Sequence, residues 1–169
     1  MEFVKIVAFC VAAAIAYGIL HDQVTAHLCV EYFTVAHPPV FSTESPFLLA
    51  IGWGTIATWR IGLPLGLALA TVARLGSRRP LSLAELRPVI FRLLVVMAVG
   101  AALAGFVGWY LVAIPRGWAQ LIPAPRHAVF AADVWAHLAG YGLGMLGGIS
   151  VVGAMLWRRL AAGSTTLDR

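Results

Sequence analysis

Four long stretches of the chain consist almost entirely of apolar residues, and shorter polar segments separate them. The stretches cover residues 3–20, 47–75, 89–114 and 129–157. Because a helix needs about 20 apolar residues to cross a hydrocarbon core of about 30 Å, each stretch predicts one transmembrane helix. No stretch shows the strand-like alternation of a membrane barrel. The pattern therefore predicts an all-α fold, an antiparallel four-helix bundle that forms a single membrane domain over residues 1–169.

The first apolar stretch has two interpretations. The single Lys5 and the small residues 12–16 also fit a secretory signal peptide that would be cleaved. If the stretch is instead retained as a span, the polar segment 21–46 connects it to the second span. This segment contains no Gly and no Pro before Pro38 and Pro39. We therefore expect the first helix to continue beyond the membrane as a helical extension and to end at the prolines.

Composition and charge agree with a membrane protein. Hydrophobic residues make up 61% of the chain and charged residues 11%, whereas a soluble domain carries about 25% charged residues. The net charge of +5 is carried mainly by residues at the ends of the apolar stretches, which is typical of topology signals. We expect the lipid bilayer as the principal partner and no nucleic acid. The chain has no recognisable nucleotide-binding loop, so we expect no nucleotide.

The positive charges also predict an orientation. Segment 21–46 contains no Lys or Arg, whereas the next connection and its borders are rich in Arg. The arginines there are Arg74, Arg78, Arg79, Arg87 and Arg92. Because positive residues concentrate on the cytoplasmic side, we expect a bacterial inner (plasma) membrane protein with both termini in the cytoplasm. The helical extension after the first span then faces outward.

Residue types that bind metals concentrate at this outward end. All five histidines fall there, namely His21, His27, His37, His127 and His137. On a continuous helix, His27 and Glu31 share one face because they are four residues apart, and His37 could join them at the helix end. Asp133 and His137 have the same spacing at the start of the fourth span. We expect the two pairs to meet.

A site of this composition suits zinc, iron or manganese. Its candidate ligands are His21, His27, Glu31, His37, Asp133 and His137. Such a site would serve a metal-dependent reaction or metal handling. A second interpretation is a non-catalytic membrane subunit whose polar cluster fixes helix packing or receives a partner. A third is a b-type haem held by His21 and His137, although the nearby acids would place charge beside an apolar ring.

Gly140, Gly144 and Gly148 continue the helix row of Asp133 and His137. Glycine rows in membranes let a second helix approach closely. We therefore expect this face of the fourth span to pack against protein rather than lipid. The approaching helix would belong to this chain, to a protein partner or to a second copy in a homo-oligomer.

Arg60 is a separate candidate near the centre of the second stretch. A charged side chain at that depth costs roughly 2.5–3.5 kcal/mol on insertion scales. Pro64, four residues later, frees the carbonyl of Arg60 and favours a kink. We expect Arg60 to bind an anion, a lipid headgroup or a quinone, with snorkelling to the interface as the alternative.

Residues 21–39 carry a recognisable succession of short motifs. The segment begins with His21, Asp22 and Gln23, continues with Glu-Tyr-Phe-Thr at residues 31–34, and ends with His-Pro at residues 37–38. In these motifs it resembles a group of uncharacterised bacterial integral membrane proteins. The resemblance covers about a tenth of the chain and implies no particular activity. It favours the segment as a functional unit.

Overall fold

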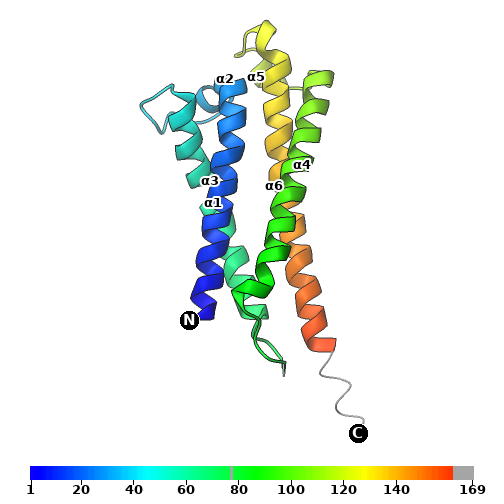
Figure 1. The fold of residues 1–169 in the computed structure, drawn as a ribbon. Coiled ribbons are helices and arrows are strands. Elements are labelled where there is room, and N and C mark those ends of the chain that lie inside the picture. Colours follow the sequence, from blue (N-terminus) through cyan, green and yellow to red (C-terminus); the bar gives the residue numbers. More distant parts are fainter. Residues whose placement is uncertain (77, 162–169) are drawn as a thin grey trace.

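The computed structural model describes residues 1–76 and 78–161, and the regular secondary structure in these residues is entirely helical. Residues 77 and 162–169 of the predicted single domain lie outside the described part. Four long helices run antiparallel side by side (Figure 1), α1 (Glu2–Leu28), α3 (Pro46–Val72), α4 (Leu83–Leu111) and α6 (His127–Ala161). Each is long and apolar enough to cross a membrane. The predicted all-helical fold with four long apolar helices is confirmed.

The helices begin and end at different residues from the apolar stretches, because caps and turns set the ends of a helix. α1 continues eight residues beyond the predicted 3–20 stretch. α4 begins at Leu83 because Ser82 and Glu85 form a capping box, in which the backbone N–H of Ser82 donates to Glu85 Oε2 at 2.9 Å. Pro88 lies within the second turn of α4 without ending the helix.

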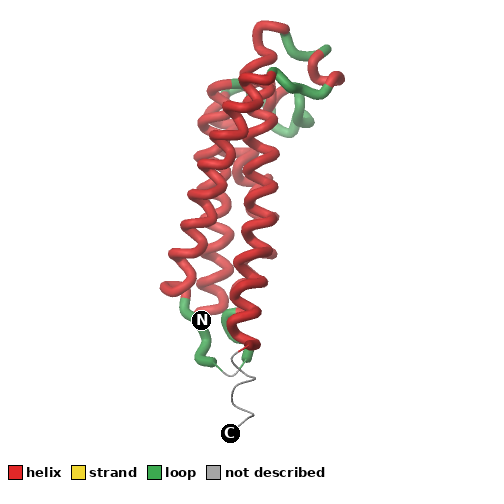
Figure 2. Tube along the Cα trace, turned by 90° about the vertical axis from the view of Figure 1, so that its right-hand side faces the viewer, coloured by secondary structure: helices red, strands yellow, loops and turns green. Residues whose placement is uncertain are grey.

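The short helices lie at the opposite end of the bundle from the start of α1 and the end of α6 (Figure 2). α2 (Val30–Thr34), α5 (Arg116–Ala119) and the 3-10 helix η1 (Ala124–Arg126) lie at one end, which we call the histidine end. The start of α1, the α3–α4 connection and the end of α6 lie at the other, which we call the arginine end. There the buried Arg159 guanidinium donates to the backbone carbonyls of Leu75, Arg78 and Arg79.

The prediction of one helix running to Pro38 is wrong. α1 ends at Leu28, Cys29 has φ −146° and ψ 82°, and α2 is only five residues long. Tertiary contacts stabilise this break. Cys29 is fully buried in a cluster with residues of α6 such as Phe130, and the Arg126 guanidinium donates to the freed carbonyl of Leu28 at 2.8 Å.

The bundle consists of two helix pairs. α1 packs closely on α3 and α4 packs closely on α6, whereas contacts between the two pairs are sparse. Glycines permit the close packing within the first pair. A Cβ atom on Gly54 of α3 would lie 2.6 Å from the backbone nitrogen of Ile19 of α1, and one on Gly62 would lie 2.9 Å from the carbonyl oxygen of Cys10.

The glycine row of α6 is arranged differently. The nearest atoms to a Cβ on Gly140, Gly144 or Gly148 belong to side chains, those of Tyr17, Met97 and Leu65. The expectation that this row brings a second backbone of the chain close is therefore wrong. The row instead borders a cavity of about 800 Å³ between the two helix pairs, which α1, α3, α4 and α6 all line.

Candidate functional site

A cluster of ligand-type side chains lies between α1 and α6 at the histidine end. His21, Asp22 and His137 each place one donor atom within 4.8 Å of the other two. Nε2 of His137 lies 3.3 Å from Oδ1 of Asp22, and Asp133 Oδ1 lies 3.2 Å from His137 Nδ1. Asp22, Asp133 and His137 are all buried. We call His21, Asp22, Asp133 and His137 the His–Asp cluster.

Aromatic side chains hold the two imidazole rings of the cluster. The rings of His21 and His137 meet edge to face, with centroids 4.6 Å apart. Tyr17, one turn before His21 on α1, stacks on the His21 ring at 5.9 Å. Tyr32 of α2 stacks on the His137 ring at 4.3 Å. The helix break at Cys29 turns α2 so that Tyr32 can reach α6.

The hydrogen bonding of His137 fixes the role of each ring nitrogen. Nδ1 lies 2.9 Å from the backbone carbonyl oxygen of Asp133. A carbonyl oxygen only accepts, so Nδ1 must carry the proton of this bond. In the neutral ring Nε2 is then an acceptor, and it faces a carboxylate oxygen of Asp22 at 3.3 Å. Two acceptors at this distance require a proton or a metal ion between them.

The Asp133 carboxylate is under-satisfied. Only 2% of the residue is exposed, and neither carboxylate oxygen has a hydrogen-bond partner in the described part of the chain. The nearby N–H of His137 is donated to the Asp133 backbone carbonyl instead. The contact of Asp133 Oδ1 with His137 Nδ1 is an ion pair only if His137 is protonated, and a buried carboxylate without a hydrogen bond is costly. The cluster therefore has the electrostatic character of a cation site.

His27 and Glu31 do not belong to this cluster. The His27 ring is exposed, and its Nδ1 lies 2.7 Å from the backbone carbonyl of Gln23. Glu31 accepts two hydrogen bonds from the Arg126 guanidinium, at 2.8 and 2.9 Å. The break at Cys29 removes the helix face that His27 and Glu31 were expected to share. The structure therefore does not bring this pair together with Asp133 and His137.

The environments of Glu31 and Cys29 make both poor metal ligands. Hydrogen bonds from the Arg126 guanidinium lower the pKa of Glu31 to about 2, so its carboxylate is ionised and already paired. Burial, with the neighbouring Glu31 carboxylate, raises the pKa of the Cys29 thiol to about 12. At neutral pH Cys29 is therefore a thiol rather than the thiolate that binds metals.

His37 lies beside the cluster but outside it. Its Nδ1 is 2.8 Å from the backbone carbonyl of Tyr32, and its ring meets the Tyr32 ring edge to face at 4.9 Å. The same Tyr32 ring stacks on His137. Burial lowers the pKa of His37 below its usual range. His37 thus supports the wall of the cluster through Tyr32. His127 lies elsewhere, with Nε2 2.9 Å from the carbonyl of Ile122.

Asp22 is the cluster residue that sequence reasoning did not select. A signal for it exists, since Ile6, Cys10, Gly18 and Asp22 are buried residues of α1 at spacings that are multiples of four. Asp22 continues the row of small and apolar residues that faces the bundle interior.

Arg60 lies outside the cluster. Its side chain is exposed on α3, as are those of its neighbours Trp59 and Ile61. No acidic side chain pairs with it among residues 1–76 and 78–161. The anion, lipid or quinone contact of Arg60 stays a prediction.

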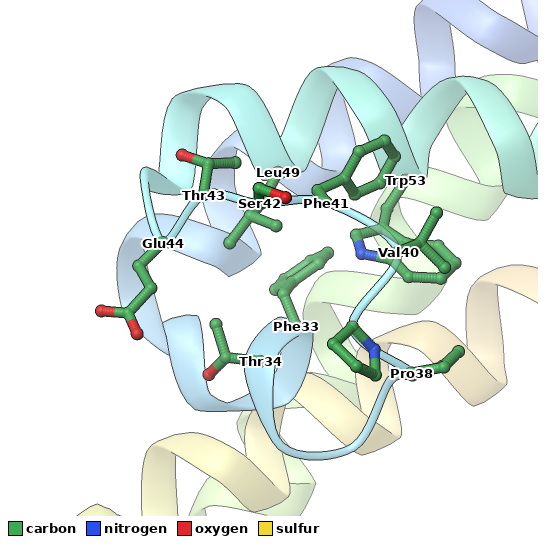
Figure 3. A pocket seen from close by; sticks show the side chains of 11 residues that line it. Phe33, Thr34, Pro38, Val40, Phe41, Ser42, Thr43, Glu44, Leu49 and Trp53 are labelled. Carbon is green, nitrogen blue, oxygen red and sulfur yellow. The ribbon is translucent and has the colours of Figure 1, made fainter.

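A second hollow at the histidine end, of about 600 Å³, lies under the connection between α2 and α3 (Figure 3). Phe33, Leu49 and Trp53 supply apolar walls, and residues 38–44 form its rim. Figure 3 shows the Glu44 carboxylate directed away from the Phe33 and Trp53 rings. Charged groups therefore do not converge in this hollow as they do in the His–Asp cluster.

Four long apolar helices and a buried His–Asp cluster indicate a helical membrane protein with a polar centre at one end of its bundle. No family model, no curated protein and no solved structure matches the chain. Its function is therefore inferred from the cluster itself.

Proposed function

We propose that the protein binds a divalent transition metal ion, zinc, iron or manganese, through His21, Asp22 and His137. Asp133 supplies the further negative charge of the site. The protein resides in the bacterial inner membrane with both termini in the cytoplasm, and the site faces outward. There the metal serves a metal-dependent reaction or metal handling. The observation that carries the proposal is the pair of acceptors, His137 Nε2 and Asp22 Oδ1, that face each other at 3.3 Å.

The distance between these two atoms suits a shared metal. Bonds of about 2.0–2.2 Å at a tetrahedral angle place two ligand atoms about 3.3–3.6 Å apart. The other nitrogen of His137 donates to the Asp133 backbone carbonyl, which is the outer contact that metal-bound histidines usually make. His21 has no hydrogen bond to either ring nitrogen in the described part of the chain, so its lone pair is free to coordinate.

Charge balance also favours a divalent cation. Asp22 and Asp133 together carry two negative charges when ionised, and both are buried. A divalent ion balances them. The competing interpretation places a proton on His137 Nε2, so that an imidazolium between two carboxylates fixes α1 against α6. The haem interpretation lacks support, because the rings of His21 and His137 contact each other at 4.6 Å and leave no space for a macrocycle between them.

Metal titration of the purified protein tests the proposal. After chelation and gel filtration in detergent, we expect the wild type to rebind one Zn²⁺, Fe²⁺ or Mn²⁺ per chain. His137→Gln and Asp22→Asn should weaken binding by at least about tenfold, as even outer-contact changes at metal sites do. His27→Gln is the matched control, since it removes an exposed histidine at the same end, and it should bind as the wild type does.

Thermal unfolding provides the second readout. A ligand at about 100 times its dissociation constant stabilises the folded state by about 2.7 kcal/mol, so the metal should raise the Tm of the wild type and of His27→Gln only. If the wild type takes up none of the three metals, or if helical His137→Gln protein binds as well as the wild type, the metal proposal fails. The imidazolium interpretation then explains the cluster.

A further inference from the structure

The cavity between the two helix pairs has the size and shape of a site for a long ligand. Its volume is about 800 Å³, within the range of about 300–1,000 Å³ that is typical of ligand sites. On α6 its lining extends from His137 to Gly153, which corresponds to about 24 Å at 1.5 Å per residue. The cavity therefore runs along the helices rather than across the bundle.

Polar side chains are concentrated at one end of this cavity. The polar lining residues are Tyr17, His21, Asp22, Thr58, His137 and Tyr141. The Thr58 side chain lies beside Gly18 of α1, but its hydroxyl donates to the backbone carbonyl of Gly54 and is already satisfied. The remaining five lie at the histidine end, beside or within the His–Asp cluster. A ligand that matches this lining has one polar end and one long apolar chain.

The charges at the polar end limit the headgroup. None of the described residues that line the cavity is Lys or Arg, and Asp22 supplies a carboxylate. A phosphate or a fatty-acid carboxylate would therefore meet negative charge without a basic partner, which is unfavourable away from water. A divalent metal in the cluster would only cancel the charges of Asp22 and Asp133. An anionic headgroup therefore does not fit, and once a metal ion or a proton on His137 balances the carboxylates, an uncharged headgroup does.

Tyr17 defines what the headgroup must offer. Its hydroxyl is buried and has no hydrogen-bond partner in the described part of the chain, and it points toward Gly140, whose ideal Cβ position lies 3.7 Å away. A buried hydroxyl that donates to nothing is costly. A carbonyl oxygen of the ligand would satisfy it, and the stacked rings of Tyr17 and His21 offer a flat aromatic surface.

We propose that this cavity binds a lipid quinone, with the quinone ring at Tyr17 and His21 and the apolar chain along the glycine row of α6. A quinone is uncharged, planar and accepts hydrogen bonds through its carbonyls, and its chain is fully apolar. Gly140, Gly144 and Gly148 all line the cavity, and as glycines they contribute no side chain that would narrow it. Quinone binding does not require the metal proposed above.

Equilibrium binding of a 1,4-benzoquinone with a decyl chain, measured against protein-free micelles, tests this proposal. The metal is first removed with a chelator, so that failure of metal binding and failure of quinone binding are separate results. We expect one quinone per chain. Gly144→Leu should lower the affinity at least about tenfold by filling the cavity, the loss expected from about 1.4 kcal/mol. Gly117→Leu is the matched control, since nothing lies within 4 Å of its ideal Cβ position and Gly117 does not line the cavity.

Tyr17→Phe tests the headgroup contact without adding volume. It removes a hydroxyl that has no partner in the described chain, so the fold should be kept, and it should lower quinone affinity about fivefold to tenfold, as loss of one hydrogen bond does. Hexadecanoate, which has an apolar chain and an anionic head, should compete poorly. If Gly144→Leu or Tyr17→Phe binds the quinone as the wild type does, or if hexadecanoate displaces it at equal concentration, the quinone proposal is wrong.

Discussion

Helix α1 ends before Cys29, and Arg126 stabilises this break in the helix. Arg126 donates both to the carbonyl of Leu28 and to the Glu31 carboxylate. These contacts tie the end of α1 and the start of α2 to the turn that precedes α6. The lost helical hydrogen bond is thus replaced by a charge-assisted one, which is stronger than a neutral bond. Residues so distant in sequence could not be paired from the local pattern.

The Glu31–Arg126 pair should make stability depend on pH. The pKa of Glu31 is about 2 in the folded protein, against an ordinary value of 4.5. Because the folded-state pKa is depressed, this contribution is fully present above about pH 4.5 and is lost as the pH falls toward 2. The Glu31 side chain is 23% exposed, and solvent screening reduces the contribution to about 1–2 kcal/mol.

Unfolding measured in detergent at pH 7 and at pH 3 checks this prediction. Glu31→Gln should be destabilised at pH 7 and should lose less stability on acidification than the wild type. Glu44→Gln changes an exposed carboxylate at the same end of the bundle. It should lose as much stability on acidification as the wild type does. If the stability of the wild type and that of Glu31→Gln change equally with pH, the Glu31–Arg126 pair is not the source of the pH dependence.

The sequence identified part of the His–Asp cluster for a physical reason. Asp133 and His137 share a helix face at a spacing visible in the sequence, and the helix between them is unbroken. Their partners on α1 depend on how that helix is rotated about its axis. The close contact of Gly18 with Gly54 fixes the rotation, and it turns Asp22 inward and leaves His27 exposed. Such contacts between helices leave no trace in the periodicity of one helix.

At the level of elements, two rows of glycines on helix faces serve two purposes in this protein. In α3 the row of Gly54, Gly62 and Gly66 brings two backbones together. In α6 a similar row borders the cavity. The four apolar helices themselves could be predicted, because hydropathy reflects the length of a span. The partner of each glycine row could not be predicted, because both rows place their glycines on one helix face at multiples of four residues.

Alanine at Gly54 and at Gly142, an α6 glycine outside the glycine row, should therefore affect stability differently. A Cβ on Gly54 would lie 2.6 Å from the Ile19 nitrogen, so Gly54→Ala must force α1 and α3 apart and should cost about 1–3 kcal/mol. Gly142→Ala meets nothing within 4 Å and should be neutral or stabilising by up to about 1 kcal/mol, because alanine favours helix. Unfolding in mixed micelles, followed by helicity, measures both. Equal stabilities for the two variants would show that the α1–α3 contact is looser than described.

For the whole molecule, the ends of the bundle differ in chemistry. Both the start of α1 and the end of α6 lie at the arginine end (Figure 1), together with the connection that carries Arg74, Arg78 and Arg79. The His–Asp cluster and the polar end of the cavity lie at the histidine end. In the orientation proposed above, the arginine end faces the cytoplasm, and the metal and quinone would then meet on the outer side of the membrane.

Cysteine labelling in intact bacteria that express the chain tests this orientation. Ser42 at the histidine end and Arg78 at the arginine end are both exposed, whereas the native Cys10 and Cys29 are 3% and 0% exposed and should react slowly. A membrane-impermeant maleimide should label Ser42→Cys in intact cells and Arg78→Cys only after permeabilisation, while a permeant maleimide labels both. The reverse pattern would place the His–Asp cluster on the cytoplasmic side. A metal entering the cluster would then come from the cytoplasm, so this experiment also determines which compartment supplies the site.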